Sequence, residues 1–455
     1  MRSPLRLRLP EPPTAFRHGP FAENAFRSHS RSERVTSLLG IALAVTFSIC
    51  LVTGLISHQL QEPIDDGTGW LAWPTGPAWG YRLTQGVHVA SGLASIPLLL
   101  AKLWSVYPKL FRWPPAVDVA DALGRLSLAV LVGSAIFQLL TGLLDIAHWY
   151  SVMPFFFPDA HYGTAWVASG AIAIHVGTKL PVVRRALAGG SAEHRPGPQS
   201  VPSASQSTDA GSAAAPRRGG DDEGADGQDR SDLDGASPAA LGPEGGRAPG
   251  LDRRGFLGGV ALATGAVTVT TIGQSVPILS GLAVLAPRDP RVGPQGLPVN
   301  KTAESARVLE SANAADYALL VVGPGQVSLS LADLRALPQH SVELPIACVE
   351  GWSATGHWTG VRMRDLLLLA GFDPADDNDR SFVRVESLQR RGRYRASSLP
   401  SRFAADPRTL LALQLGDEPL HLQHGYPARL IAPNRPGVLQ TKWVSTVTVL
   451  PRGAS

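Results

Sequence analysis

One of the two cysteines of the chain, Cys348, lies among residues that could support thiol or metal chemistry. Residues 347–353 have the sequence ACVEGWS, and residues 357–361, HWTGV, follow shortly after. Because the apolar run 344–347 precedes Cys348, we expect the sulfur at the end of a buried strand. Glycine lets a backbone approach a bulky ligand closely, and tryptophan beside a thiol shapes a partly dry pocket. This stretch is therefore the first candidate for an active site.

A single cysteine in this setting can play three roles. It can be a small core residue, as many unpaired buried cysteines are. A catalytic nucleophile would need the His and Asn or Asp signature of a thiol hydrolase, which the sequence around Cys348 lacks. Its thiolate could instead bind a metal held mainly by another group, because one cysteine cannot make a protein-only site. The residues alone leave the core and metal-ligand roles open.

An ordered series of motifs follows Cys348: WTGV at 358–361, DLL at 365–367, GDEPL at 416–420, HGYPARLI at 424–431 and QTKWV at 440–444. With these motifs the chain from about 298 to 450 resembles the molybdopterin-binding domain of the sulfite oxidase family. In that family a single cysteine thiolate ligates a molybdenum that the dithiolene of a pterin also holds. The resemblance implies a molybdopterin-dependent oxidoreductase with Cys348 as the metal ligand and catalytic residue.

The resemblance also implies which residues bind the pterin and its phosphate. His424 and Arg429 stand where the family binds them, and arginine suits a phosphate through bidentate hydrogen bonds. Taken singly, Asn300 is equally well explained as a turn residue and Lys301 as a solvated charge. The full set of pterin-binding candidates is Asn300, Lys301, Thr302, Ser387, His424, Arg429, Gln440, Thr441 and Lys442.

The pattern of the C-terminal part predicts an α+β domain over residues 297–455. Short strands are expected at 317–322, 344–348, 382–387, 428–431 and 445–450, and helices at 331–336 and 363–370. About 155 residues are enough for one hydrophobic core. The resemblance further leads us to expect that the immunoglobulin-like dimerisation domain usual in the family is missing, since the printed sequence stops at Ser455.

Four apolar runs precede this domain, at 35–57, 83–101, 126–144 and 161–178, and none contains Lys, Arg, Asp or Glu. Each is close to the ~20 residues that cross a ~30 Å hydrocarbon core. Buried helices of a soluble protein are the alternative, which four uncharged runs disfavour. The sequence therefore predicts an all-α, four-helix transmembrane domain over 35–185.

The positive charges predict the orientation of these helices. The segment 1–34 contains seven arginines, and Lys and Arg recur in the loops at 102–125 and 179–185. The loops 58–80 and 147–160 contain no Lys or Arg but several aromatic residues. By the positive-inside rule, 1–34 is a cytoplasmic tail, and the chain returns to the cytoplasm after the fourth helix.

Histidines inside apolar helices indicate a function, because polar groups in lipid are costly. His161 and His175 are 14 residues apart, nearly four helical turns, and therefore share one face about 21 Å apart. Together with His88 they favour bis-histidine haem over simple hydrogen bonds between helices. His58 and His148, near the outer face, are rim residues or alternative ligands.

These helices resemble the four-helix b-type cytochromes of the cytochrome b561 and formate dehydrogenase membrane-subunit kind. The residues that carry the resemblance are YR at 81–82, His88, Gly92 and the His161–His175 pair. It implies that His88 and His161 share an outer haem b. It also implies that His175 binds an inner haem with a histidine near the start of the first helix, where residues 35–40 offer none.

Residues 186–250 are rich in Gly, Ser, Ala, Pro, Asp and Glu and predict a disordered cytoplasmic linker. Residues 251–258, LDRRGFLG, then lead into an apolar run to about 285, which resembles an internal twin-arginine export signal. An ordinary fifth membrane helix over 251–287 is the alternative. Both interpretations place the C-terminal domain on the outer face of a bacterial cytoplasmic membrane.

The combined hypothesis is a membrane-anchored molybdenum oxidoreductase that exchanges electrons between the quinone pool and a small-molecule substrate through haem b. Reduction of S-oxides or N-oxides is preferred over sulfite oxidation, for which Arg362, Arg384, Arg390, Arg391 and Arg393 are candidate anion-binding residues. Two competing hypotheses are a cofactor-binding electron-transfer module without turnover and a pure b-type cytochrome. No basic stripe with interleaved aromatics suggests nucleic acid, and two distant cysteines predict no disulfide framework.

Overall fold

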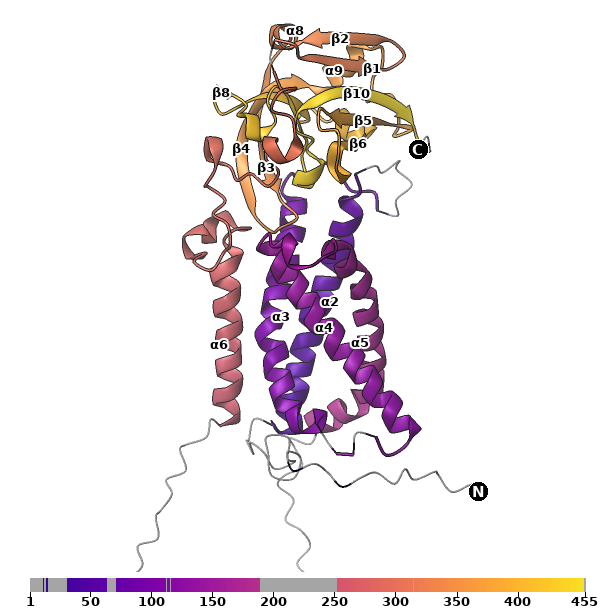
Figure 1. Ribbon diagram of the computed structural model, residues 1–455, viewed down its shortest axis with the longest axis vertical. Coiled ribbons are helices and arrows are strands. Elements are labelled where there is room, and N and C mark those ends of the chain that lie inside the picture. Colours follow the sequence, from indigo (N-terminus) through magenta and orange to yellow (C-terminus); the bar gives the residue numbers. More distant parts are fainter. Residues whose placement is uncertain are drawn as a thin grey trace, which may run out of the picture.

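The computed structural model describes residues 11, 14, 31–63, 71–111, 113–114, 116–188, 252–313 and 315–453. It consists of long helices and a mixed α+β domain that sits on one end of them (Figure 1). The predicted tail 1–34 and linker 186–250 lie almost entirely outside the described residues.

The four predicted apolar helices are present, and each is longer than its apolar run. They are α2 (Glu33–Leu60), α3 (Gly80–Leu110), α4 (Val119–Ile146) and α5 (Phe157–Ala188). Capping explains two of the extensions, because Ser32 accepts a hydrogen bond from the first turn of α2 and Asp118 does the same for α4. Contacts of α2 with α3 and α5, and of α4 with α3 and α5, join the four helices side by side.

The outer surface of these helices is apolar. On α2, large side chains at intervals of three or four residues are exposed: Leu38, Ile41, Val45, Ile49 and Val52. This spacing places them on one helix face with no protein against it. Five helices of the described residues, α2 to α6, are long and apolar enough to cross a membrane.

Helix α6 (Arg253–Ile272) stands beside α3, outside the group of four, and leads toward the α+β domain (Figure 1). Asp252 caps its start by accepting a hydrogen bond from Gly255 N at 2.6 Å. The expected run to about residue 285 is too long. The helix ends at Ile272 because the chain turns at Gly273, where a Cβ would collide with the backbone oxygen of Leu279.

The α+β domain contains two five-stranded sheets. The first has the order β2-β1-β10-β5-β6, with β1 (Ala318–Val322), β2 (Gln326–Ser330), β5 (Ser381–Ser387), β6 (Ala396–Pro400) and β10 (Val444–Pro451). The second has the order β3-β4-β7-β8 with β9 also on β7, and comprises β3 (His340–Ala347), β4 (Ser353–Arg362), β7 (Leu410–Leu415), β8 (Glu418–Pro419) and β9 (Arg429–Ile431). Only β1 and β10 pair in parallel within these sheets.

Short helices accompany the strands: α7 (Ala303–Ala306), α8 (Leu331–Ala336), α9 (Met363–Leu369) and α10 (Ser401–Ala404). The five strands and two helices expected from the sequence are present, with ends that differ by a few residues. The strands β2, β4, β6, β7 and β8 were not expected from the sequence. The main core includes Leu319, Val383 and Leu411, and therefore joins the two sheets.

The α+β domain is held against the helices by the segment between α2 and α3. Asn434 makes three hydrogen bonds there: its backbone oxygen accepts from Trp73 Nε1 at 3.0 Å, its side-chain oxygen accepts from Tyr81 N at 2.6 Å, and its Nδ2 donates to Pro74 O at 2.8 Å. Arg393 adds ion pairs to Glu62 at 2.6 Å and to Asp159 at 3.2 Å. The orientation of the domain relative to the helices is therefore fixed by specific contacts.

Candidate active site

Cys348 directly follows β3, where the sequence predicts it, and is 1% exposed. The chain turns tightly after it and enters β4. Cys348 N donates to Trp352 O at 2.8 Å, and Gly351 N donates to Cys348 O at 3.1 Å. Gly351 has a φ of 92°, which a residue with a side chain adopts only with strain. The turn therefore fixes the direction in which the sulfur points.

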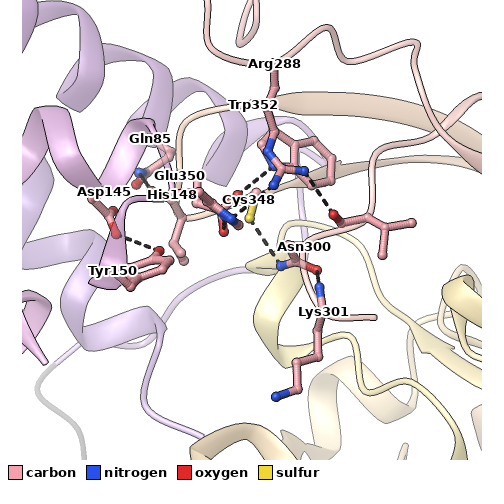
Figure 2. A network of polar contacts seen from close by, with 12 residues as sticks. Gln85, Asp145, His148, Tyr150, Arg288, Asn300, Lys301, Cys348, Glu350 and Trp352 are labelled. Carbon is pink, nitrogen blue, oxygen red and sulfur yellow. Dashed lines mark hydrogen bonds and ion pairs between the residues drawn. The ribbon is translucent and has the colours of Figure 1, made fainter. Parts of the chain in front are cut away.

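The sulfur has a neutral side-chain donor in Asn300, whose Nδ2 lies 3.5 Å from Sγ (Figure 2), and the backbone N–H of Val349 also interacts with it. Burial raises the pKa of the Cys348 thiol to about 12, and the carboxylate of Asp145 acts in the same direction. The bond from Asn300 and the charge of Arg288 act against this rise. A free thiol with this pKa keeps its proton at neutral pH, so a bound cation would be needed to hold the thiolate form.

A small cavity of about 10 Å³ lies beside the sulfur. It brings together five of the residues singled out in the sequence: Asn300, Cys348, His424, Arg429 and Lys442. Its other walls are Leu297, Pro298, Ile346, Trp352 and Gly437. Residues from four separate stretches of sequence thus meet at Cys348.

Arg429 begins β9 and is 4% exposed, yet no carboxylate of the described residues pairs with it. Its guanidinium lies 5.5 Å from the ring centre of Trp358, and Nη1 donates to His424 O at 3.2 Å. Its Nε has no hydrogen-bond partner in the described protein. Burial lowers the pKa of Arg429 to about 9. A buried cation without an acid is costly, so this position calls for an anionic ligand.

Two more basic side chains border the same cavity. Lys442 Nζ donates only to backbone oxygens, those of Lys301 at 2.9 Å and Gln423 at 2.8 Å. Burial and the charge of Arg429 hold the pKa of Lys442 well below its usual range. Burial and the same charge lower the pKa of His424 to about 4. Arg429 and Lys442 form an anion-binding corner, which fits the phosphate that the resemblance implies. His424 Nε2 donates to Pro294 O at 2.6 Å, so its neutral ring offers only Nδ1, an acceptor, to a ligand.

The remaining pterin candidates divide into two groups. Lys301, Ser387, Gln440 and Thr441 line a larger cavity next to this one. The Oε1 atom of Gln440 is buried without a donor among the described residues, so it is available to a ligand N–H group. Thr302 lines neither cavity, and its side chain caps α7 by accepting from Ser305 N. The structure thus gives Thr302 a structural role and does not bring it to the site.

The larger cavity has a volume of about 960 Å³ and extends from between α2, α3, α4 and α5 into the α+β domain. His88 and His161 line its part between the helices, and Lys301 lines the opposite part. The residues that line both cavities are Asn300, Gly437 and Lys442. The sulfur site and the space between the helices are therefore neighbours.

His88 is oriented by the backbone of α2. Its Nδ1 lies 2.9 Å from Cys50 O, an atom that can only accept, so Nδ1 carries the hydrogen. In the neutral ring Nε2 then carries no hydrogen, which is the form a metal ligand requires. A Cβ on Gly54 would lie 2.8 Å from the His88 ring, so glycine at this position leaves room for the imidazole.

His161 is oriented in the same manner by α4. Its Nδ1 lies 2.7 Å from Thr141 Oγ1, and that hydroxyl donates to Phe137 O at 2.7 Å. The hydroxyl must therefore accept from Nδ1, which again leaves Nε2 unprotonated. Both histidines consequently fit the axial ligands of a haem. His175 is half-buried on α5 and does not line this cavity, so the structure does not bring it to the other two.

Three further residues shape the site: the two tryptophans, for which the sequence suggested a pocket wall, and Arg288, to which it assigned no role. Trp352 walls the sulfur cavity, Trp358 underlies Arg429, and Arg288 reaches the site from the segment after α6. The two tryptophans were part of the stretch that first drew attention, and their distance of four and ten residues from Cys348 was the available signal. The sequence gave no signal for Arg288, because its contacts at the site depend on tertiary structure alone.

Comparisons with known proteins agree with this geometry. Residues 306–454 match the family model of the oxidoreductase molybdopterin binding domain. The mitochondrial sulfite oxidase of Drosophila melanogaster is 31% identical over 159 residues, which are 30% of this chain and 28% of that protein. The mitochondrial sulfite oxidase of Homo sapiens is 30% identical over 161 residues, 30% of this chain and 29% of that protein. The chain therefore matches less than a third of the length of these relatives.

Two further similarities concern other proteins. A putative protein-methionine-sulfoxide reductase subunit, YedZ1, of Azospira oryzae is 32% identical over 120 residues, which are 26% of this chain and 43% of that protein. The sulfane dehydrogenase SoxCD of Paracoccus pantotrophus aligns with a TM-score of 0.27 and 22% identity, covering 30% of this chain and 39% of that chain.

Proposed function

We propose that the chain is a membrane-anchored oxidoreductase that links the quinone pool to oxygen-atom transfer. The support is that residues 306–454 match the oxidoreductase molybdopterin binding domain and are similar to a part of the sulfite oxidases. The observation that carries the proposal is the pair of adjoining cavities. One holds Cys348 beside Arg429, a buried cation that no carboxylate of the described residues pairs with, and the other is lined by His88 and His161.

Around Cys348 the protein supplies one metal ligand and an anion-binding corner. Cys348 would contribute the thiolate, and Arg429 and Lys442 would bind the phosphate of the cofactor. The acceptors Gln440 Oε1 and His424 Nδ1 would be available to N–H or O–H groups of the cofactor. When bound, the molybdenum cofactor supplies two-electron oxygen-atom transfer, and the protein orients it and excludes water.

Between the helices, His88 and His161 would hold one haem b near the outer face. The support is that both rings have Nδ1 engaged and both line the same cavity. Haem b supplies one-electron transfer between quinone and the catalytic domain. His175 does not line this cavity, so its position does not support an inner haem.

The preferred direction is reduction of an S-oxide or N-oxide. For a sulfoxide the overall reaction is R2SO + QH2 → R2S + Q + H2O, which balances two electrons and two protons. The similarity to the putative methionine-sulfoxide reductase subunit supports this direction. Two of the arginines considered for sulfite are already paired, Arg384 with Glu386 and Arg393 with Glu62. The similarity to sulfite oxidases favours the second candidate, oxidation of sulfite by quinone.

The proposed location is the bacterial cytoplasmic membrane, with the catalytic domain on the outer face. The support is the charge pattern: positive residues lie at one end of the helices, and Arg253 and Arg254 open α6 at that same end (Figure 1). A twin-arginine export route would suit a domain that folds around its cofactor before crossing.

The test is purification of the full chain in detergent, followed by molybdenum and haem analysis and assays with reduced viologen. We expect about one molybdenum per chain, a b-type haem spectrum, and viologen oxidation with sulfoxides or N-oxides. Activity with sulfite and a quinone analogue alone would select the second candidate. Cofactor without any turnover would favour an electron-transfer module, and haem without molybdenum a pure cytochrome; either result overturns the enzyme proposal.

A further inference from the structure

We propose that α3 is a positioning element for Cys348. Gln85 of this helix holds the loop 348–353, which carries the sulfur, on the same helix face that presents His88. The inference rests on the proposed function for the identity of the metal and the haem. The contacts themselves belong to this chain and can be tested without either cofactor.

Gln85 is buried at the end of a chain of hydrogen bonds. Gln61 Nε2 donates to Ser57 Oγ at 2.7 Å, and Ser57 Oγ donates to Gln85 Oε1 at 2.7 Å. Gln85 Nε2 then donates to Val349 O at 2.5 Å. Because a backbone carbonyl can only accept, the Gln85 amide must face Val349 with its nitrogen. Ser57 thereby fixes the amide in the orientation that binds the loop.

Other residues of the loop contact the same part of the molecule. A Cβ on Gly351 would lie 2.8 Å from Val89 of α3, so the loop rests directly on this helix. Ser275, just after α6, donates to Gly351 O, and Ser353 N donates to Gln274 O at 2.8 Å. The loop therefore lies between α3 and the segment that follows α6.

Glu350 holds the loop from a third side (Figure 2). Its carboxylate accepts from Trp352 Nε1 at 3.0 Å and pairs with His148 Nε2, which lies between α4 and α5. Arg288 lies 3.0 Å from His148 Nδ1 and donates to Val299 O at 2.9 Å. Each of residues 349, 350, 351 and 353 thus has a partner outside the α+β sheets.

The helix that holds the loop is also the helix that carries His88. Gln85, His88 and Val89 are three and four residues apart and occupy one face of α3. The route from the imidazole to the sulfur crosses one helical turn, one hydrogen bond and the peptide between Val349 and Cys348. A displacement of α3 at His88 would therefore be passed to the position of Cys348.

The decisive experiment measures amide hydrogen exchange of residues 348–353 in the full chain in detergent, without molybdenum cofactor. Gln85→Leu removes the donor to Val349 O, and Ser57→Ala keeps that donor but removes the hydroxyl that orients it, together with the bonds of that hydroxyl to Gln61 and Tyr81. The matched control is Arg408→Ala, which removes a different contact between the same two parts, Arg408 Nη2 to Thr75 O at 3.1 Å.

We expect exchange of the loop amides to accelerate at least about tenfold in Gln85→Leu, less in Ser57→Ala, and to stay unchanged in Arg408→Ala, because a buried carbonyl would lose its donor. In the cofactor-loaded protein, Gln85→Leu should alter the Mo(V) electron paramagnetic resonance signal while the haem absorption is retained. Wild-type exchange within twofold in Gln85→Leu would overturn the inference, as would equal acceleration in the control. Absence of molybdenum and haem from the wild-type protein would refute the proposed function, and the exchange result would still decide the role of α3.

Discussion

Replacing Arg429 with methionine is expected to change two properties in opposite directions. In the cofactor-free protein the substitution should raise stability, and in the loaded protein it should weaken cofactor retention. The reason is that Arg429 is buried, lacks a carboxylate partner among the described residues, and lies beside Cys348. Without a bound anion the buried charge of Arg429 lowers the stability of the protein. With a bound anion the same charge contributes to binding.

The size of the cost follows from the pKa. Burial lowers the pKa of Arg429 from 12.5 to about 9. At 1.36 kcal/mol per pKa unit, holding the charge costs on the order of 5 kcal/mol in the cofactor-free protein. The unfolded chain binds the proton more tightly, so this penalty is complete at neutral pH and is relieved only as the pH rises through 9. Lost packing and one lost hydrogen bond offset part of the gain, which leaves about 1–4 kcal/mol.

The assay is thermal unfolding of the cofactor-free chain in detergent, followed by tryptophan fluorescence. For a domain of this size the gain corresponds to a rise in Tm of at least about 2 °C. In the loaded protein, loss of charge-assisted hydrogen bonds of about 1.5–3 kcal/mol should increase cofactor release at least about tenfold. Arg364→Met is the control, since Arg364 is half-exposed and paired with Asp373 at 2.7 and 2.9 Å, and it should leave cofactor retention unchanged. A lower Tm with unchanged cofactor retention in Arg429→Met would refute the reasoning.

Three further outcomes are expected. Cys348→Ser should abolish turnover and molybdenum retention while the haem spectrum stays intact; near-normal activity would remove the thiolate from the proposed mechanism. Gly54→Val should displace the His88 ring, 2.8 Å from the new Cβ, and lower haem content severalfold, whereas Gly133→Val, which meets no atom within 4 Å, should not; equal haem in both variants argues against the ligand. Because the pKa of His424 is about 4 in the folded protein, the unfolded chain takes up the proton at a higher pH. The free energy of unfolding of the cofactor-free protein should therefore fall by about 2–3 kcal/mol between pH 7 and pH 4. His424→Gln should weaken this pH dependence in unfolding curves measured at several pH values.

The sequence predicted the long helices and the position of Cys348 because both depend on local signals. Uncharged runs of about 20 residues leave few alternatives to membrane helices. An apolar run that ends in a cysteine needs only a short strand to place the sulfur, and β3 ends at Ala347. The motif series then identified Arg429 and Lys442, which the structure brings to the same cavity.

The missed strands carry patterns that local rules assign to loops or leave ambiguous. The strand β4 contains Gly356 and Gly360, and glycine normally weakens a strand. Here a Cβ on Gly356 would lie 2.8 Å from the ring of Trp358, so the glycine makes room for that side chain. The strand β7 is apolar except for Gln414 and is buried on both faces, and periodicity cannot distinguish such a short run from a helix.

The contacts around Cys348 could not be predicted for a different reason. Gln85 and Val349 are 264 residues apart in sequence, and their hydrogen bond exists only once the α+β domain rests on the helices. The same holds for Glu350, to which the sequence assigned no role and which is buried against His148. Thr302, a ligand candidate from its family position, caps α7 and lines neither cavity, and its role toward a pterin stays a prediction.

The three bonds of Asn434 have a mechanical consequence. Domains joined through small interfaces usually move relative to one another. A redox centre on such a domain can exchange electrons with a second centre only when the motion brings the two close together. Here Asn434 is hydrogen-bonded to Trp73, Pro74 and Tyr81. The distance between the Cys348 sulfur and the two imidazoles is therefore set when the chain folds. We therefore expect the rate of electron transfer between the proposed haem and molybdenum sites to stay the same when glycerol raises the viscosity of the solvent. A rate that falls in proportion to viscosity would show that the α+β domain moves relative to the helices.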